Sequence, residues 1–106
     1  MELKEAFGLA LRQFRNSKGL TQEAFSSLSS RTYMSTLERG LKMPKLEKVD
    51  DLSRMLGIHP ASLIAGCYLK LEDPLNADQL LNRIRDELLL FERAASDNEL
   101  PSESKL

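Results

Sequence analysis

The stretch that decides the fold is LTQEAFSSLSSRTYMSTLERG, residues 20–40. Thr21 is a suitable N-cap residue, and the acidic Glu23 follows it in what would be the first helical turn. Ser30 is a second suitable N-cap, and Gly40 is placed to end the helix that Ser30 begins. The stretch therefore predicts two short helices, one ending before residue 29 and one running to about residue 39, with a tight turn between them.

The two helices are expected to bury different kinds of side chain. The apolar positions of the first are Ala24, Phe25 and Leu28, and those of the second are Met34 and Leu37. The outer side of the second helix is polar and carries Arg31, Thr32, Tyr33, Ser35 and Thr36. A helix that starts at a turn and has a polar outer side suits insertion into the major groove of DNA, and the N–H groups at helix N-termini suit phosphates.

The rest of the chain also contains residues that are typical of helix ends. Leu3, Phe7, Leu11 and Phe14 recur at spacings of one helix face, and Gly19 is placed as a C′ glycine. Pro44 is expected to lie in a loop, and a helix is predicted from about residue 46 to Leu56, with Gly57 after its end. Pro60 suits the first position of another helix, and His59 before it is expected to cap that helix or to lie at the surface. The residues expected to face inward from these two helices are Leu46, Val49, Leu52, Met55, Leu56, Leu63 and Ile64.

A separate C-terminal arm is also predicted. Residues 70–76 contain Asp73-Pro74 and are expected to be a linker, and Asn76 is placed to cap a helix over 77–95. Leu81, Ile84, Leu88, Phe91 and Ala95 recur in steps of three and four, which suits a dimer seam. The alternative is that this helix folds back onto its own domain as a further core helix. The polar residues 96–106 are expected to be a disordered tail.

Residues 7–65 resemble the Cro/C1-type helix-turn-helix family, the Xre-like regulators. The residues that carry the resemblance are Leu20-Thr21-Gln22-Glu23, Ser30-Arg31-Thr32-Tyr33-Met34-Ser35, Leu37-Glu38-Arg39-Gly40, Pro44 and Leu56-Gly57. The resemblance implies an all-α fold, with a lambda-repressor-like DNA-binding domain of five helices over residues 1–69. The chain departs from the family at the turn, which is one residue shorter and has Ser27-Leu28-Ser29-Ser30 where a glycine is customary.

The resemblance also implies roles for individual residues. Positions that read bases hold Arg31, Thr32 and Thr36, and positions that contact the DNA backbone hold Gln22, Ser30, Tyr33 and Arg39. Lys42 and Lys45 lie in the following loop, where phosphate contact is expected. Arg31 is the first candidate for specificity, because a guanidinium can pair with both O6 and N7 of guanine.

These assignments have plainer alternatives. Gln22 would serve only to cap its helix, Tyr33 would pack against the preceding helix, and Lys42 and Lys45 would be solvated surface residues. Arg15 and Glu38 match family positions that form a largely buried ion pair between the first and third helices. The resemblance therefore gives these two residues a structural role, which is to fix the orientation of the recognition helix.

The net charge of −1 hides two segments of opposite charge. Residues 12–48 hold eight Lys and Arg against three Glu, whereas residues 73–106 hold four Lys and Arg against eight Asp and Glu. Such asymmetry favours a polyanionic partner for the basic segment, although two ordinarily solvated surfaces would show it as well.

The sequence shows no recognisable pattern for metal binding, cofactor binding or catalysis. His59 and Cys67 are the only histidine and cysteine, so they do not make a zinc site of the usual kind. Neither a glycine-rich phosphate loop nor a set of nucleophile and base is recognisable, so we expect no catalysis, no cofactor and no metal. No apolar stretch is long enough to span a membrane, and a lone cysteine suits the reducing cytoplasm.

The sequence therefore predicts a transcriptional regulator that binds specific double-stranded DNA, as a repressor on a palindromic operator and as a homodimer. One alternative is the antitoxin of a toxin–antitoxin pair, whose C-terminal arm would bind a toxin protein while its domain represses the operon. Another is a protein-interaction module that does not bind DNA. Four residues suited to DNA contact argue against this alternative, namely Gln22, Arg31, Thr36 and Arg39.

Overall fold

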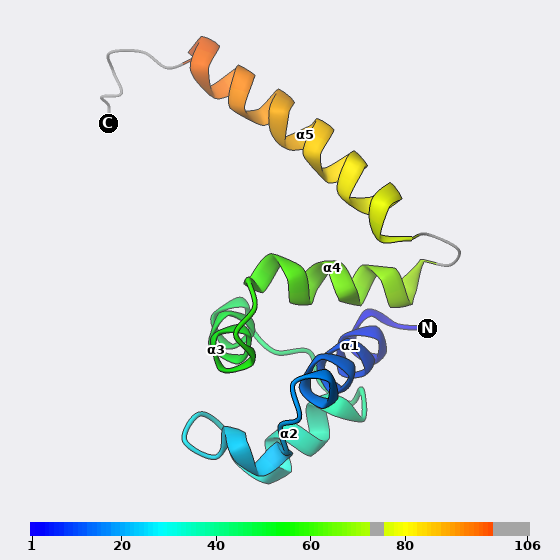
Figure 1. The fold of residues 1–106 in the computed structure, drawn as a ribbon, viewed down its shortest axis with the longest axis vertical. Coiled ribbons are helices and arrows are strands. Elements are labelled where there is room, and N and C mark those ends of the chain that lie inside the picture. The colour runs from blue at the N-terminus through cyan, green and yellow to red at the C-terminus, as the bar shows by residue number, and fades with distance from the viewer. Residues whose placement is uncertain (73–75, 99–106) are drawn as a thin grey trace. The chain divides into compact units, whose positions relative to one another are not determined.

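A computed structural model describes residues 1–72 and 76–98. The chain divides into two compact units, Met1–Pro74 and Leu75–Leu106, which are described separately. Within the described residues every regular element is helical (Figure 1). The elements are α1 (Leu3–Ser17), the 3-10 helix η1 (Gln22–Phe25), α2 (Arg31–Glu38), α3 (Leu46–Leu56), α4 (Pro60–Leu71) and α5 (Ala77–Asn98). The all-α class is confirmed.

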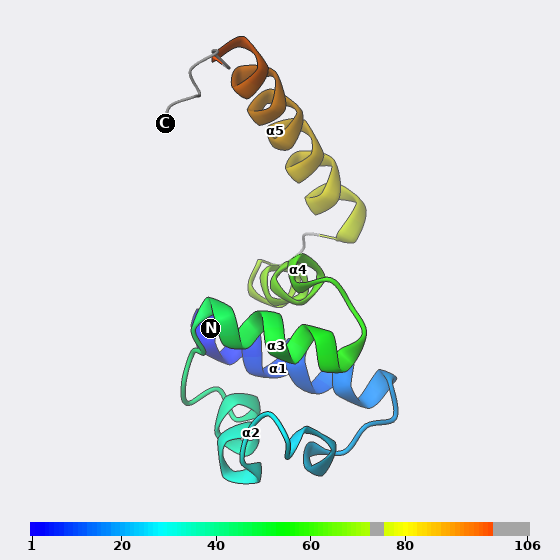
Figure 2. The same ribbon diagram turned by 90° about the vertical axis from the view of Figure 1, so that its left-hand side faces the viewer.

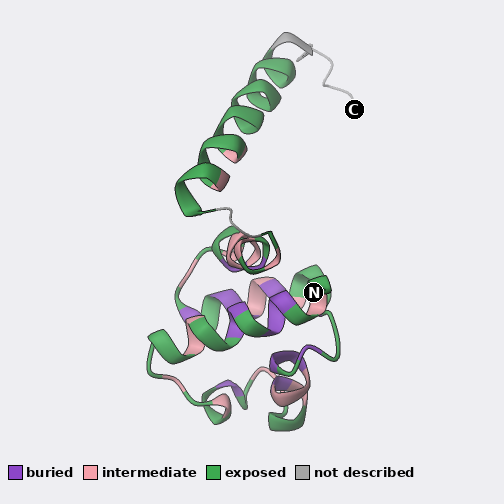
Figure 3. Ribbon diagram, turned by 90° about the vertical axis from the view of Figure 1, so that its right-hand side faces the viewer, coloured by how far each residue is buried: buried purple, intermediate pink, exposed green. Residues whose placement is uncertain are grey.

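Helix α1 is the centre of the first unit and lies between α2 and α4 (Figures 1 and 2). It begins with a capping box between Glu2 and Glu5 and ends before Gly19, whose φ of +68° is the left-handed conformation expected of a C′ glycine. Its apolar side is buried against its neighbours, as Figure 3 shows in purple. The fully buried side chains of α1 are Ala6, Phe7, Ala10 and Leu11.

The first helix of the predicted pair is a single 3-10 turn, η1. Thr21 has the extended backbone of an N-cap, but its side chain makes no capping hydrogen bond. Phe25 is fully buried and Leu28 is half-buried, as predicted, whereas Ala24 is exposed, contrary to prediction. One turn of helix directs few side chains to one side, and Phe25 is the residue of η1 that is fully buried.

Helix α3 has the predicted bounds and ends at Gly57, whose φ is +71°. Val49, Leu52 and Leu56 are buried, but the predicted inward positions of Leu46 and Met55 are wrong, because these side chains are 71% and 38% exposed. At about 100° per residue, Met55 lies beyond the edge of the stripe formed by the three buried residues. Leu46 is the first residue of the helix and lies at the rim of the core.

Helix α4 completes the core of the first unit. The Nδ1 atom of His59 accepts a hydrogen bond from the backbone N–H of Ala61 at 3.0 Å, and Pro60 is the first helical residue, so the predicted cap is confirmed. Leu63 is fully buried and Ile64 is half-buried. Among the described residues, no helix is both long and apolar enough to cross a membrane.

Helix α5 is the one described element of the second unit. Asn76 and Gln79 cap its start reciprocally, since each side chain accepts a hydrogen bond from the other residue's backbone N–H, at 2.9 and 3.0 Å. The helix extends to Asn98, beyond the end predicted at residue 95. Of the predicted tail, residues 99–106 lie outside the described residues, as do 73–75 of the predicted linker. None of the residues 77–96 is buried (Figure 3).

Candidate nucleic-acid interface

The second predicted helix, α2, begins at a well-formed cap. The Ser30 hydroxyl oxygen accepts a hydrogen bond from the backbone N–H of Tyr33 at 3.0 Å. Met34 and Leu37 are fully buried on one side of α2, while Arg31 and Thr32 are exposed. The helix therefore shows solvent a polar N-terminal surface and anchors itself by its apolar side.

The three residues expected to read bases lie on α2, where Arg31 and Thr32 are exposed and Thr36 is half-buried. Thr32 and Thr36 are one turn apart, and the Thr36 hydroxyl donates a hydrogen bond to the Thr32 carbonyl oxygen at 2.9 Å. This bond uses the hydroxyl hydrogen of Thr36 within its own helix and leaves the methyl group and an oxygen lone pair for other contacts. Arg31 is exposed and has no hydrogen bond or ion pair to the described residues.

Tyr33 lies at the edge of the core. It is half-buried and packs against the core residues, and the ammonium groups of Lys42 and Lys48 lie 5.4 and 5.6 Å from the centre of its ring. These distances are those of cation–π contacts. Lys45 is exposed and stands as the N-cap residue of α3, where its side chain makes no capping hydrogen bond. Arg39 is exposed just after α2.

The opposite end of α2 is held by a cluster of charged and polar groups around Glu38. The Glu38 carboxylate accepts hydrogen bonds from Arg15 Nε at 2.6 Å and Arg15 Nη2 at 2.9 Å. It also accepts one from Gln22 Nε2 at 3.1 Å, and Arg12 Nε lies 3.5 Å from Oε1. The structure thus brings together Arg15, Glu38 and Gln22 from α1, α2 and η1.

The protonation of Glu38 follows from these contacts. Burial alone would raise its pKa, but the hydrogen bonds from Arg15 and Gln22, with the charges of Arg15 and Arg12, lower the pKa below the ordinary 4.5. The hydrogen bond to Glu38 raises the pKa of Arg15 against the opposing effect of burial. The pair is therefore charged at neutral pH and ties α2 to α1.

Sequence reasoning missed the residue that lets α1 approach this end of α2. A Cβ atom added at Gly8 would lie 2.8 Å from the carbonyl oxygen of Glu38, and it would also meet the carbonyl of Leu37. No side chain fits there, because the obstruction is backbone. An isolated glycine in the middle of an apolar helix pattern was the available signal.

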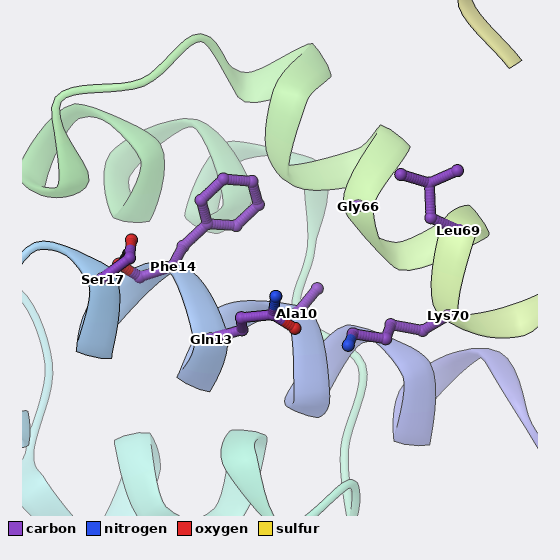
Figure 4. Close-up of a pocket in the computed structure, with 7 residues that line it drawn as sticks. All are labelled: Ala10, Gln13, Phe14, Ser17, Gly66, Leu69 and Lys70. Atoms are coloured by element: carbon purple, nitrogen blue, oxygen red, sulfur yellow. Dashed lines mark hydrogen bonds between the residues drawn. The ribbon is translucent and has the colours of Figure 1, made fainter. Parts of the chain in front are cut away.

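A shallow pocket lies between α1 and α4, away from the residues expected to contact DNA (Figure 4). Phe14 points from α1 toward α4, where a Cβ added at Gly66 would come within 2.9 Å of its ring. The other residues that line the pocket are Ala10, Gln13, Ser17, Leu69 and Lys70. In the described part of the chain, no group of three or more His, Cys, Asp or Glu residues is placed to hold a metal ion.

Comparison with known proteins identifies the segment that contains η1 and α2. A family profile described as a helix-turn-helix domain matches residues 6–65. The chain belongs to the helix-turn-helix family. The resemblance to Xre-like regulators is confirmed, and the relatives support a DNA-binding regulator of transcription.

Two curated members of the family are similar over the first unit. Over 61 residues the chain is 39% identical to the control protein C.BamHI of Bacillus amyloliquefaciens, covering 55% of this chain and 75% of that protein. Over 66 residues it is 33% identical to the uncharacterised HTH-type transcriptional regulator y4dJ of Sinorhizobium fredii, covering 60% of this chain and 86% of that protein.

Solved structures of the family superpose on the chain as well. Two crystal structures of the clp gene regulator ClgR from Corynebacterium glutamicum match with TM-scores of 0.64 and 0.61, at 35% and 27% identity. The first match covers 68% of this chain and 95% of the other, and the second covers 94% and 98%. The second match is long enough to include residues of α5.

Proposed function

We propose that this protein is a repressor that binds a palindromic operator in double-stranded DNA as a homodimer, with α2 as the recognition helix. The observation that carries the proposal is the two-sidedness of α2. Its apolar residues Met34 and Leu37 are fully buried and Glu38 is held by Arg15, while Arg31 and Thr32 are exposed beside the Ser30 cap. The buried side of such a helix holds it in place on the domain. Its exposed side chains carry hydrogen-bond donors that suit the base edges in a major groove.

The proposed base contacts come from Arg31, Thr32 and Thr36. Arg31 has the reach and the paired donors to bind guanine O6 and N7, and such a pair discriminates against a wrong base by about 1–3 kcal/mol. Thr32 and Thr36 lie on the same side of α2, where a hydroxyl or methyl group suits contacts with neighbouring bases.

The proposed backbone contacts surround that surface. Gln22 uses one amide hydrogen on Glu38, so its second hydrogen is available for a phosphate while it braces α2. Tyr33 serves both packing and contact, because it is half-buried. The full proposed set is Gln22, Ser30, Tyr33, Arg39, Lys42 and Lys45.

The homodimer is proposed on the character of α5. Leu81, Leu88 and Phe91 are exposed and Ile84 is half-buried, and together they follow the three-four spacing of a coiled-coil seam. A helix with so much exposed apolar surface gains free energy by pairing with an identical helix. A dimer with two recognition helices would read two half-sites related by symmetry, about one DNA turn apart.

Regulation of transcription is supported by the names of the similar proteins, which are a control protein, a transcriptional regulator and a gene regulator. We propose repression by occupation of an operator that overlaps a promoter, in the cytoplasm and without enzymatic activity. Co-purification of a small protein bound to the C-terminal arm would instead favour the antitoxin alternative.

A band-shift experiment with fragments of the source genome tests the proposal. The protein is expected to shift a small subset of fragments at low ionic strength, and raising the salt concentration is expected to release them, because phosphate contacts displace counterions. Absence of any salt-sensitive shift at low ionic strength would defeat the DNA-binding proposal.

A further inference from the structure

A lysine outside the expected DNA contacts links α3 to the turn that precedes α2. The ammonium group of Lys48 donates a hydrogen bond to the carbonyl oxygen of Leu28 at 3.2 Å. The same group lies 5.6 Å from the centre of the Tyr33 ring, in the first turn of α2. We propose that Lys48 is a positioning residue for sequence recognition, which fixes the N-terminal end of α2 and so the place of Arg31 and Thr32 over the bases.

The turn itself explains why such a link is needed. It lacks the customary glycine, and its backbone closes on Phe25, whose carbonyl oxygen accepts the N–H groups of both Leu28 and Ser29 at 2.9 and 2.8 Å. Among the described residues, no backbone N–H donates to the carbonyl oxygen of half-buried Leu28. The Lys48 ammonium supplies this carbonyl with a charged donor in a part-buried place, and hydrogen bonds from charged donors are the stronger ones.

Lys48 differs in this from the neighbouring lysines. Lys48 is half-buried and its ammonium is engaged with the protein, whereas Lys45 is exposed and has no hydrogen bond or ion pair to the described residues. Lys42 lies beside the Tyr33 ring at 5.4 Å but makes no hydrogen bond to the turn. We therefore expect Lys45 to act on phosphate and Lys48 to act through α2.

With Lys48 in this role, α2 is held at both ends. Arg15 and Gln22 hold Glu38 at the C-terminal end, and Lys48 holds Leu28 and Tyr33 at the N-terminal end. The side chain with the best prospects for base recognition, Arg31, stands at the N-terminal end. Small displacements there would spoil paired hydrogen bonds to a base and leave contacts with phosphates largely intact.

The inference rests on the proposed function and is tested with Lys48→Met, which keeps most of the aliphatic stem and removes the charge. A duplex is first selected from random DNA with the wild-type protein, and a shuffled duplex of the same composition serves as the non-specific probe. We expect Lys48→Met to reduce the ratio of the two affinities about tenfold. The non-specific affinity and the salt dependence should stay at wild-type values.

The matched variants are Lys45→Met and Lys48→Arg. Lys45→Met should weaken binding to both duplexes and reduce the slope of log affinity against log salt by about 0.9. Lys48→Arg should restore the affinity ratio, because a guanidinium can also donate to Leu28 and stack on Tyr33. If Lys48→Met instead weakens both duplexes equally and reduces the salt slope, or leaves the affinity ratio unchanged, the positioning role is wrong.

A second readout needs no DNA. In the free protein, Lys48→Met should move the amide proton–nitrogen resonances of residues 28–36, and Lys48→Arg should return most of them. Unmoved resonances would overturn the inference. If no duplex can be selected, the proposed DNA binding fails, and the resonances still decide whether Lys48 positions α2.

Discussion

Arg15 and Glu38 form a two-pronged ion pair between α1 and the end of α2, with Nε–Oε2 and Nη2–Oε1 distances of 2.6 and 2.9 Å. The side chain of Glu38 is 1% exposed and that of Arg15 is 13% exposed. The third prong of the guanidinium, Nη1, donates to the carbonyl oxygen of Leu20 at 2.8 Å. One arginine thus links α1 both to the start of the helix-turn-helix segment and to the C-terminal end of α2, the proposed recognition helix.

Removing Glu38 should therefore destabilise the first unit strongly. Glu38→Ala strands a largely buried guanidinium and is expected to cost about 3–5 kcal/mol. That cost corresponds to a fall in Tm of more than about 10 °C for a domain of this size. The matched control is Asp50→Ala, which breaks the exposed Asp50–Arg54 pair and should cost less than about 0.5 kcal/mol. Thermal melting followed by circular dichroism measures both, and an unchanged Tm for Glu38→Ala would refute the buried pair.

The same carboxylate should make stability depend on pH in the acid range. Because the folded-state pKa of Glu38 lies below its ordinary value of 4.5, its contribution is fully present above that pH. The contribution is lost as the pH falls through the folded-state pKa. We expect the Tm difference between wild type and Glu38→Gln to be constant from about pH 7 to about pH 5 and to shrink below about pH 4.5. A difference that stays constant to the acid limit would contradict this assignment.

Gly8→Ala should destabilise the protein although alanine favours helices. The added Cβ would meet backbone carbonyls of Leu37 and Glu38, which cannot move without displacing α2. We expect a loss of about 1–3 kcal/mol in denaturant unfolding. Gly66→Ala is the matched control, because its Cβ meets the Phe14 ring, which lines the pocket of Figure 4. Gly66→Ala should stay within about 1 kcal/mol of wild type, and equal costs for the two variants would show that the α1–α2 approach is not special.

Two adjacent leucines of α5 test the proposed dimer. Leu88 and Leu89 are 55% and 51% exposed, but Leu88 alone belongs to the three-four seam. Wild type and Leu89→Asp are expected to sediment with twice the chain mass at micromolar concentration. Leu88→Asp is expected to sediment as a monomer, because pairing would bury a carboxylate in the seam. A monomeric wild type, or two variants that behave alike, would count against the seam.

Much of this fold was open to sequence reasoning because its helix ends carry local signals. Ser30, Gly40, Gly57 and Pro60 act on the backbone within a few residues of themselves, so they located helix ends without knowledge of the tertiary structure. Periodicity likewise predicted the burial of Phe7 and Leu11 in α1 and most of the buried side of α3, whereas Leu3, on the same predicted face of α1, is 37% exposed.

The predictions of burial that failed concern residues at the edge of the core, where burial depends on how far a neighbouring helix extends. Ala24, Leu46 and Met55 are apolar and suitably spaced, yet they are exposed, since spacing gives a direction around a helix but not the edge of the core. Gly8 and Lys48 were missed for a related reason. Their partners lie far along the chain, as the separation of 20 residues between Lys48 and Leu28 shows, and no local pattern reports such contacts.

The most direct test of the central claim, that the N-terminal surface of α2 reads DNA bases, is selection from random duplexes with wild type and Arg31→Ala in parallel. Wild type should enrich a palindrome with half-sites about one helical turn apart. Arg31→Ala should lose preference at one base pair in each half-site and keep the rest, while the control Lys45→Ala should weaken all sequences alike. An unchanged preferred sequence for Arg31→Ala, or no enriched sequence for wild type, would contradict the account.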